Sequence, residues 1–392
     1  MSRLNVGNLY NENEDGSPNI SGISTFSSTH YFVPPSGSTA ERPSFADPGM
    51  IRFNTDSGHL EYYNGVEWTS VIVNNQELGI SNNAAGTSGG LGVRGVFSGI
   101  GGYPTISNVM NYVNVETTGN AIDFGDLTLP TRYGNAVGSR TRGIVYEAIT
   151  PSSTYDTDIQ YFTFASTGNT IDFGGNSTQG RYGALGLSNS TRGLRGGGFS
   201  SPDNSNVIDY ITMASTGVDA QDFGDLIVSF RYGNGSCASS TRGIMTGGYQ
   251  GGGSGNDNSI SFVTISTQGN AQDFGDLSLA RNSGSQGGSN SVRGIFCGGH
   301  TPTSVNTIDF VTIATLGDAQ DFGDLSSATE LGATAASKTR LVIALGDYPS
   351  YVDTIEYVQI MTTGNAVDFG NLTITGGDSG NNMGNSNGHG GL

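Results

Sequence analysis

The chain has 392 residues, of which 63 are glycine, and a formal net charge of −18. So much glycine argues against a helical protein, and without the strict triplet of collagen it indicates tight turns between many short strands. The acidic charge disfavours a nucleic-acid partner and leaves at most weak binding of divalent cations. No apolar stretch approaches membrane-spanning length, and the first residues lack the apolar core of a signal peptide.

Residues 1–48 are polar with scattered proline, a composition that predicts an extended N-terminal arm. In residues 49–80, turn signals at 54–58 and 64–65 separate three short β segments, so we expect a small β meander. A unit this small can hardly bury a core alone. We therefore expect its aromatic residues to form one cluster that mediates attachment or a symmetric homo-oligomer. These residues are Phe53, Tyr62, Tyr63 and Trp68.

The meander segment resembles a module of tailed-phage virion proteins, those of marine cyanobacterial phages among them. The shared theme runs from Gly49 through Arg52, an aromatic residue and Asn-Thr-Asp to Asn64-Gly65 and Trp68. The upstream stretches 19–26 and 29–37 are similar to the same source. The resemblance implies a structural protein located in the phage virion, with its N-terminal part attached to other virion proteins.

From about residue 83 to 375 the chain is repetitive. The tripeptide Asp-Phe-Gly occurs six times, at intervals of 49, 50, 51, 48 and 47 residues, and a period near 50 is typical of a repeat architecture. Six copies, without the other kinase motifs, exclude a kinase magnesium loop. An aromatic residue stands 11 or 12 residues before each Asp. We expect the phenylalanines to form the core between repeats: Phe124, Phe173, Phe223, Phe274, Phe322 and Phe369.

Arginines form a second column in register with the tripeptide. They are Arg94, Arg142, Arg192, Arg242, Arg293 and Arg340. We expect these arginines to cap strand carbonyls and the tripeptide aspartates to cap the Phe-Gly turn. The alternative is a girdle of ion pairs that links the two columns, which would also be structural.

Each period holds four short strands with alternating β-branched and aromatic residues and no helical pattern. Four-stranded units repeated radially make a β-propeller. The order of Gly247-Gly248, Phe262, Phe274 and Arg281 resembles the kelch repeat, although phenylalanine replaces the usual tryptophan. Glu330 also stands where other copies have Arg132, Arg181, Arg231 or Arg281. The resemblance implies an all-β, six-bladed kelch-like propeller, with six blades preferred over seven.

Residues 376–392 form a tail rich in glycine and asparagine. Its segment 386–390 is similar to the Ser-x-Thr-Arg-Gly stretch that recurs in the repeats. We therefore expect the tail to add a strand to the first repeat and to close the ring as a clasp.

The segments after the glycine pairs vary most in length and composition. Because all repeats are oriented alike, these loops should emerge on one face, and loops on a rigid scaffold often carry function. Their aromatic residues are candidates for stacking on the sugars of a host-surface glycan. They are Tyr103, Tyr155, Phe199, Tyr249, His300, Tyr348 and Tyr351.

No motif indicates catalysis, so we expect no enzymatic activity and no cofactor. Cys237 and Cys297 fall in different repeats, the four histidines lack zinc spacing, and no catalytic triad motif or phosphate-binding loop is present. The acidic residues Glu147 and Glu330 depart from the repeat and have no evident partner. A propeller glycoside hydrolase is disfavoured because it needs paired carboxylates, and the Asp-box motif is missing.

These observations predict a non-enzymatic virion structural protein, without nucleic-acid binding or membrane insertion. Its N-terminus would be anchored to the particle and its propeller displayed outward, as in a tail fibre or spike that adsorbs to host glycans. The alternative is a head decoration or other particle-stabilising protein. A cellular kelch adaptor is disfavoured by the phage-like N-terminal segment.

Overall fold

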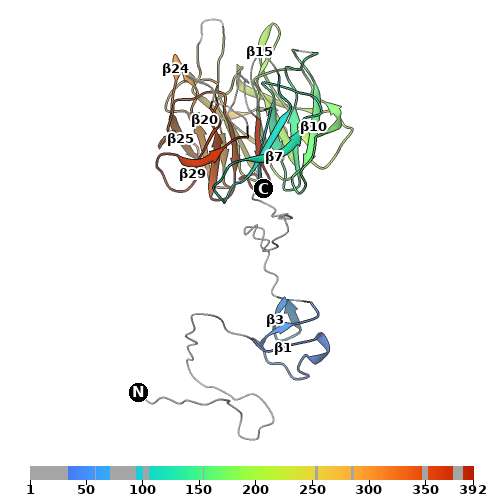
Figure 1. Ribbon diagram of the computed structural model, residues 1–392. Coiled ribbons are helices and arrows are strands. Elements are labelled where there is room, and N and C mark those ends of the chain that lie inside the picture. The colour runs from blue at the N-terminus through green and yellow to red at the C-terminus, as the bar shows by residue number, and fades with distance from the viewer. Residues whose placement is uncertain are drawn as a thin grey trace, which may run out of the picture. The chain divides into compact units, whose positions relative to one another are not determined.

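The computed structural model describes residues 34–57, 59–70, 94–99, 106–152, 154–251, 255–283, 287–346, 352–373 and 383–392. The chain divides into two compact units, Met1–Asn74 and Asn75–Leu392, called here the small unit and the large unit. The described residues form β-strands, turns and a single short 3-10 helix, so the predicted all-β class is confirmed (Figure 1). Within these residues, no helix has the length and apolar character needed to cross a membrane.

The small unit is a four-stranded sheet with the order β1-β2-β3-β4. Its strands are β1 (Ser36–Gly37), β2 (Ile51–Asn54), β3 (His59–Tyr63) and β4 (Trp68–Ser70), and the helix η1 spans Thr39–Glu41. Strands β2, β3 and β4 form the antiparallel meander expected from the turn signals. Strand β1 pairs in parallel with β2, so the sheet begins inside the segment predicted to be an extended arm, and the predicted boundary after residue 48 is wrong.

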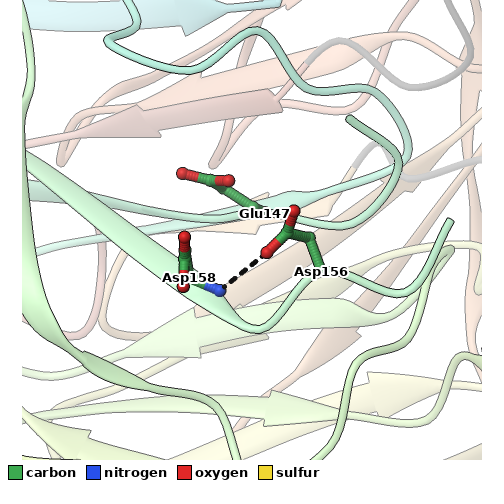
Figure 2. A group of neighbouring side chains, drawn as sticks. All are labelled: Glu147, Asp156 and Asp158. Carbon is green, nitrogen blue, oxygen red and sulfur yellow. Dashed lines mark hydrogen bonds between the residues drawn. The ribbon is translucent and has the colours of Figure 1, made fainter. Parts of the chain in front are cut away.

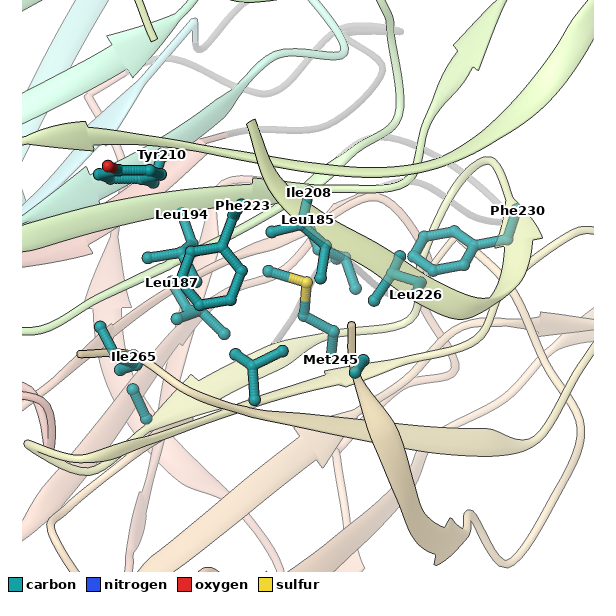
Figure 3. Packing of buried hydrophobic residues seen from close by; sticks show 13 residues of the cluster. Leu185, Leu187, Leu194, Ile208, Tyr210, Phe223, Leu226, Phe230, Met245 and Ile265 are labelled. Atoms are coloured by element: carbon teal, nitrogen blue, oxygen red, sulfur yellow. The ribbon is translucent and has the colours of Figure 1, made fainter. Parts of the chain in front are cut away.

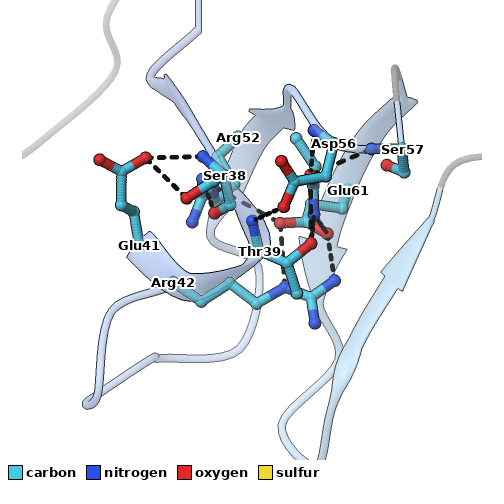
Figure 4. Close-up of polar contacts among 9 residues, drawn as sticks. Ser38, Thr39, Glu41, Arg42, Arg52, Asp56, Ser57 and Glu61 are labelled. Carbon is cyan, nitrogen blue, oxygen red and sulfur yellow. Dashed lines mark hydrogen bonds and ion pairs between the residues drawn. The ribbon is translucent and has the colours of Figure 1, made fainter.

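A polar network attaches this early segment to the sheet. Glu61 is fully buried and accepts hydrogen bonds from Arg42 Nη2 (2.6 Å) and Asn54 Nδ2 (3.2 Å), while Arg52 Nε lies 3.5 Å from its other oxygen (Figure 4). The hydrogen bond from Arg42 is the main cause that lowers the pKa of Glu61. Arg52 Nη2 also donates to the carbonyl oxygen of Ser38 (2.9 Å). Because charged residues hold the segment in place, hydrophobic patterning did not reveal it.

The described part of the large unit contains six antiparallel sheets, each with four main strands. The first sheet is β31 (Met383–Ser386), β5 (Arg94–Ser98), β6 (Val109–Asn114) and β7 (Ile122–Asp126). The second is β8 (Asn135–Gly138), β9 (Arg142–Tyr146), β10 (Asp158–Thr163) and β11 (Ile171–Asn176). The third is β12 (Leu185–Ser188), β13 (Arg192–Gly196), β15 (Asp203–Thr212) and β16 (Gln221–Phe230), with the short strand β14 (Phe199–Ser200) paired to β15.

The fourth sheet is β17 (Ser236–Ala238), β18 (Arg242–Thr246), β19 (Ser259–Thr264) and β20 (Gln272–Asp276). The fifth is β21 (Gly287–Ser289), β22 (Arg293–Cys297), β25 (Thr307–Thr312) and β26 (Gln320–Asp324), beside a small hairpin of β23 (His300–Thr301) and β24 (Thr303–Ser304). The sixth is β27 (Ala333–Ala336), β28 (Arg340–Ala344), β29 (Thr354–Gln359) and β30 (Val367–Asn371).

The first sheet joins the two ends of the large unit. Strand β31, from the C-terminal tail, pairs antiparallel with β5, with Met383 opposite Ser98 and Ser386 opposite Gly95. The expectation that the tail adds a strand to the first repeat is thereby confirmed.

The first strand of each sheet contacts the first strand of the next sheet. This series of contacts runs from β8 through β12, β17, β21, β27 and β31 and returns to β8. A cavity of about 60 Å³ is lined by residues from all six of these strands and by His389. Small residues such as Gly186, Gly288 and Ala336 line it, which lets the strands approach one another.

The six tripeptide phenylalanines are at most 2% exposed, so the predicted core column is confirmed. Each ring packs edge-on against the aromatic residue 12 or 13 positions earlier, with ring centres 5.9–6.3 Å apart. The hydrophobic clusters extend across neighbouring sheets. Phe223 and Leu226 of the third sheet, for example, share a cluster with Met245 and Ile265 from the fourth repeat (Figure 3).

The glycine of the tripeptide allows neighbouring repeats to bond to one another. In each copy the phenylalanine carbonyl accepts a hydrogen bond of 2.7–2.8 Å from the N–H of a turn glycine in the next repeat. The pairs are Phe124 with Gly168, Phe173 with Gly217, Phe223 with Gly269, Phe274 with Gly317, Phe322 with Gly364, and Phe369 with Gly119. The last pair joins the final repeat to the first. We call this set of contacts the inter-repeat seam.

The arginine column caps backbone carbonyls, as expected, but the carbonyls belong to the next repeat. The Nη1 atoms of these arginines lie 2.6–3.1 Å from the oxygens of Phe164, Met213, Ile265, Ile313, Ile360 and Glu116. Each guanidinium also lies 4.2–4.7 Å from the centre of an aromatic ring in its own repeat. Among the described residues no ion pair joins this column to the tripeptide aspartates, and the Asp cap on the turn is seen at Asp172, which accepts from Gly174 N (2.8 Å).

Candidate functional site

Six partly exposed aromatic rings meet on the second, third and fourth repeats of the large unit. We call this group the aromatic surface. Its members are Tyr133, Tyr155, Tyr182, Phe199, Tyr232 and Tyr249.

Tyr182 occupies the centre of the aromatic surface. Its ring centre lies 5.9 Å from that of Tyr133, 5.3 Å from that of Phe199 and 5.7 Å from that of Tyr232. The ring of Tyr155 stacks on Tyr182 at 6.2 Å. Such separations are within the range of favourable aromatic contacts, so the rings support one another while keeping an exposed part.

Arg231 extends the aromatic surface to its sixth ring. The guanidinium carbon lies 5.0 Å from the ring centres of both Phe199 and Tyr249, which is cation–π distance. Burial, followed by the neighbouring tyrosines Tyr133 and Tyr182, raises the pKa of Tyr232. Its hydroxyl therefore stays protonated and can donate a hydrogen bond.

The backbone holds two of these tyrosines in a conformation that glycine adopts more easily. Tyr133 has φ 57° and Tyr232 has φ 53°, and the third sheet has Gly183, with φ 67°, at the matching turn. In this region a side chain is disfavoured by roughly 1–2 kcal/mol. Hydrogen bonds from Gly183 N to Tyr133 O and from Ser283 N to Tyr232 O (both 2.9 Å) stabilise the two tyrosines in this conformation. Ser283 and Leu331 have φ 55° and 61° at the matching turns, so the conformation belongs to the repeat, and the large rings are what distinguishes Tyr133 and Tyr232.

The structure brings together three of the predicted loop residues, Tyr155, Phe199 and Tyr249. Phe199 belongs to β14, and Asn204 in the same hairpin donates to the carbonyls of Tyr249 (2.9 Å) and Gln250 (2.7 Å). His300 lies apart on β23, where its Nδ1 is 3.5 Å from the carboxylate of Glu330. The expectation that Glu330 lacks a partner is therefore wrong. Tyr103, Tyr348 and Tyr351 lie outside the described residues.

Sequence reasoning missed Tyr133, Tyr182 and Tyr232. All three belong to Arg-Tyr-Gly triplets at 132–134, 181–183 and 231–233, a signal that was visible in the sequence. The sequence places the arginines of these triplets in one kelch-like column, but the structure separates them.

Arg281 stands at the corresponding place in the fifth repeat, and of these four arginines two are structural and two lie at the aromatic surface. Arg181 and Arg281 are fully buried and form ion pairs with Asp209 (2.8 Å) and Asp309 (3.1 Å). Arg132 and Arg231 are partly exposed and lie near the rings of Tyr133 and Tyr249. The turn of the third repeat is shifted by one residue relative to that of the fourth. Tyr182 forms the β-bridge with Phe199, whereas Arg231, one position earlier in its triplet, forms the β-bridge with Tyr249.

The four aromatic residues predicted to form one cluster in the small unit lie on two faces of its sheet. Phe53 and Tyr62 are 38% and 39% exposed and share a face, since Phe53 pairs with Leu60 and Tyr62 lies two residues further along β3. Tyr63 and Trp68 pair across the other face, with ring centres 5.6 Å apart. The prediction of a single cluster is therefore wrong, because strand alternation separates neighbouring residues.

Searches of the sequence against protein-family models and against curated proteins found no match.

Proposed function

We propose that the large unit is a six-bladed, kelch-like β-propeller. Three features support this arrangement. Six four-stranded sheets follow one another along the chain, and contacts between their first strands return to the starting sheet. The inter-repeat seam includes a bond from the last repeat to the first, Gly119 N to Phe369 O (2.8 Å). A cavity lined by all six first strands would then lie on the propeller axis.

We infer that the protein is a non-enzymatic structural component of a phage virion, which adsorbs to host-surface glycans in the manner of a tail fibre or spike. The single observation that carries the adsorption is the aromatic surface. The virion location rests on the resemblance of residues 49–68 to a phage structural module.

Tyrosine suits glycan binding because its flat face packs on the apolar face of a sugar ring while its hydroxyl makes hydrogen bonds. The aromatic surface adds to this the guanidinium of Arg231 and spans three neighbouring sheets, so it fits several linked sugars better than one. Individual contacts of this kind are weak. Several copies on one particle would supply the avidity that adsorption needs.

The small unit would provide attachment and oligomerisation. Its exposed sheet face presents Ile51, Phe53 and Tyr62, which are 53%, 38% and 39% exposed. Symmetry-related copies or another virion protein can cover such a face. A homo-oligomer attached through the small unit would leave the large unit available for the host.

Binding to an array of bacterial surface polysaccharides tests the proposal. The variants are Tyr182→Ala, which removes the central ring, and Tyr232→Gly, which introduces the residue that Gly183 provides at the matching turn. Phe45→Ala is the control, because Phe45 is a 91% exposed aromatic residue of the small unit. We expect both surface variants to lose affinity by at least about tenfold, corresponding to roughly 1.4 kcal/mol, and the control to retain it.

Polysaccharide binding that survives both Tyr182→Ala and Tyr232→Gly would show that another part of the surface adsorbs the host. A folded protein that binds no polysaccharide, yet is found by antibody labelling on phage heads, would instead support decoration of the particle.

A further inference from the structure

Glu147 is a buried carboxylate at a position where the other repeats have no acidic residue. It directly follows β9, and the residues that follow β5, β13, β18 and β22 in the same way are Gly99, Gly197, Gly247 and Gly298. Glu147 is 2% exposed. Its Oε1 accepts a hydrogen bond from Gln160 Nε2 (2.6 Å), whereas its buried Oε2 has no hydrogen-bond partner.

Two aspartates bring their carboxylates to the same place. One oxygen each from Glu147, Asp156 and Asp158 lie within 4.8 Å of one another (Figure 2). Asp156 is held in position by the N–H groups of Thr157 (2.9 Å) and Asp158 (3.3 Å) and by the Thr150 hydroxyl, which donates to its Oδ2 (2.8 Å). Asp158 is exposed, so the group is open to solvent on one side.

The surroundings of Glu147 differ from those of the buried acids Asp209 and Asp309. Buried Asp209 and Asp309 each have a buried arginine at ion-pair distance, 2.8 and 3.1 Å away. Glu147 has the neutral amide of Gln160, and its neighbouring charges are acidic. Burial, followed by Asp156, Asp158 and Asp172, raises the pKa of Glu147 to about 8. A bound cation would supply the missing positive charge.

We propose that Glu147, Asp156 and Asp158 bind one Ca²⁺ ion. Carboxylate oxygens are hard ligands, and Ca²⁺ accepts them in irregular geometry at about 2.4 Å, so two oxygens on one ion lie at most about 4.8 Å apart. Mg²⁺ demands a near-ideal octahedron and keeps several of its waters, so proteins usually hold it through only one or two carboxylates. A site built from three protein carboxylates therefore suits Ca²⁺ better than Mg²⁺.

Ca²⁺ would join residues 154–158 to the end of β9. This segment carries Tyr155, whose ring stacks on Tyr182, so the ion would stabilise one edge of the aromatic surface. The site itself does not depend on glycan binding, and the two proposals can fail separately.

Calorimetric titration of the full chain with Ca²⁺, after removal of metal with a chelator, tests the site. We expect one binding event that Glu147→Gln and Asp158→Asn weaken by at least about tenfold. Asp257→Asn is the matched control, because Asp257 caps the start of β19 as Asp156 caps β10, but Gly247 replaces Glu147 there. This control should bind Ca²⁺ like the unaltered chain.

Melting temperatures distinguish a metal site from a structural carboxylate. Without metal, Glu147→Gln should melt at the same or a higher temperature than the unaltered chain, since it removes an uncompensated buried acid. With millimolar Ca²⁺ the unaltered chain should gain stability and the variant should not. Absence of Ca²⁺ binding, or binding that both Glu147→Gln and Asp158→Asn leave intact, would overturn the proposal.

Discussion

At the residue scale, His389 shows how the C-terminus is held against the strands that line the cavity. Its Nε2 donates to the carbonyl oxygen of Gly138 (2.8 Å), and Gly390 N donates to Ser289 O (2.8 Å). The ring thus contacts β8, and the backbone of the next residue bonds to β21. Burial, with a smaller contribution from Arg140, lowers the pKa of His389 to about 4, even though the hydrogen bond to Gly138 opposes this change.

The lowered pKa predicts a pH dependence of stability. An unfolded histidine titrates near 6.5, so between about pH 6.5 and 4 the unfolded chain binds a proton that the folded chain does not. The contribution of His389 to stability is present above about pH 6.5 and is lost as the pH falls toward 4. We expect His389→Gln, which keeps a donor for Gly138, to reduce the fall in melting temperature over this range. Identical pH profiles for variant and unaltered chain would contradict the assignment.

At the scale of the repeat, the tripeptide glycine is required by the next repeat and not by its own strand. A Cβ on Gly275 would lie 2.5 Å from the carbonyl carbon and oxygen of Gly317. Backbone atoms cannot move away as a flexible side chain would. The same close approach recurs at Gly125, Gly224, Gly323 and Gly370.

Alanine substitutions can separate this close approach from backbone strain. Gly275 has φ 146° and Gly317 has φ 145°, but a Cβ on Gly317 would meet nothing within 4 Å. Both substitutions place a side chain at a positive φ, which costs free energy. Only the Cβ of Gly275→Ala would also overlap backbone atoms of the neighbouring repeat. In urea titrations, we expect Gly275→Ala to lower the free energy of unfolding by roughly 1–3 kcal/mol more than Gly317→Ala does. Equal losses for the two variants would show that the inter-repeat seam tolerates a side chain.

At the scale of the whole molecule, one short strand from the C-terminus completes the first sheet. Met383 on β31 is 2% exposed and packs with Val96, Val145 and Phe162. Strand β31 also contacts β27 of the sixth sheet and β8 of the second. Its loss would open the series of contacts that joins the last repeat to the first.

Deletion of residues 383–392 is therefore expected to destabilise the large unit severely. We expect a fall in melting temperature large enough to leave much of the unit unfolded at 37 °C, or failure to fold, with partial recovery when a peptide of residues 383–392 is added. Removal of residues 1–74 is the control, because these residues form a separate compact unit, and it should leave the melting of the large unit unchanged. Unaltered melting after the C-terminal deletion would show that β31 contributes little to stability.

The sequence by itself determined the features that recur in every repeat. Spacing and alternation identified the four strands, the Phe274 column and the arginine column, because each recurs at a fixed place in all six repeats. The strand in the tail was also predictable, because residues 386–390 are similar to the repeat. Features that depart from the repeat carried much less information.

The tertiary structure alone decided which non-repeating residues meet. Tyr155 and Tyr182 come from different repeats, and their contact depends on how neighbouring sheets pack and on a one-residue difference in the turn. Glu147 becomes part of a candidate metal site only because the chain before β10 brings Asp156 close to the end of β9. In the small unit, charged side chains hold Ser38–Arg42 against the sheet, although the hydrophobic pattern of this segment predicts no packed structure. Repetition encodes each sheet locally. The aromatic surface arises between sheets, where long-range packing sets the distances, and the acidic group arises from a loop that departs from the repeat.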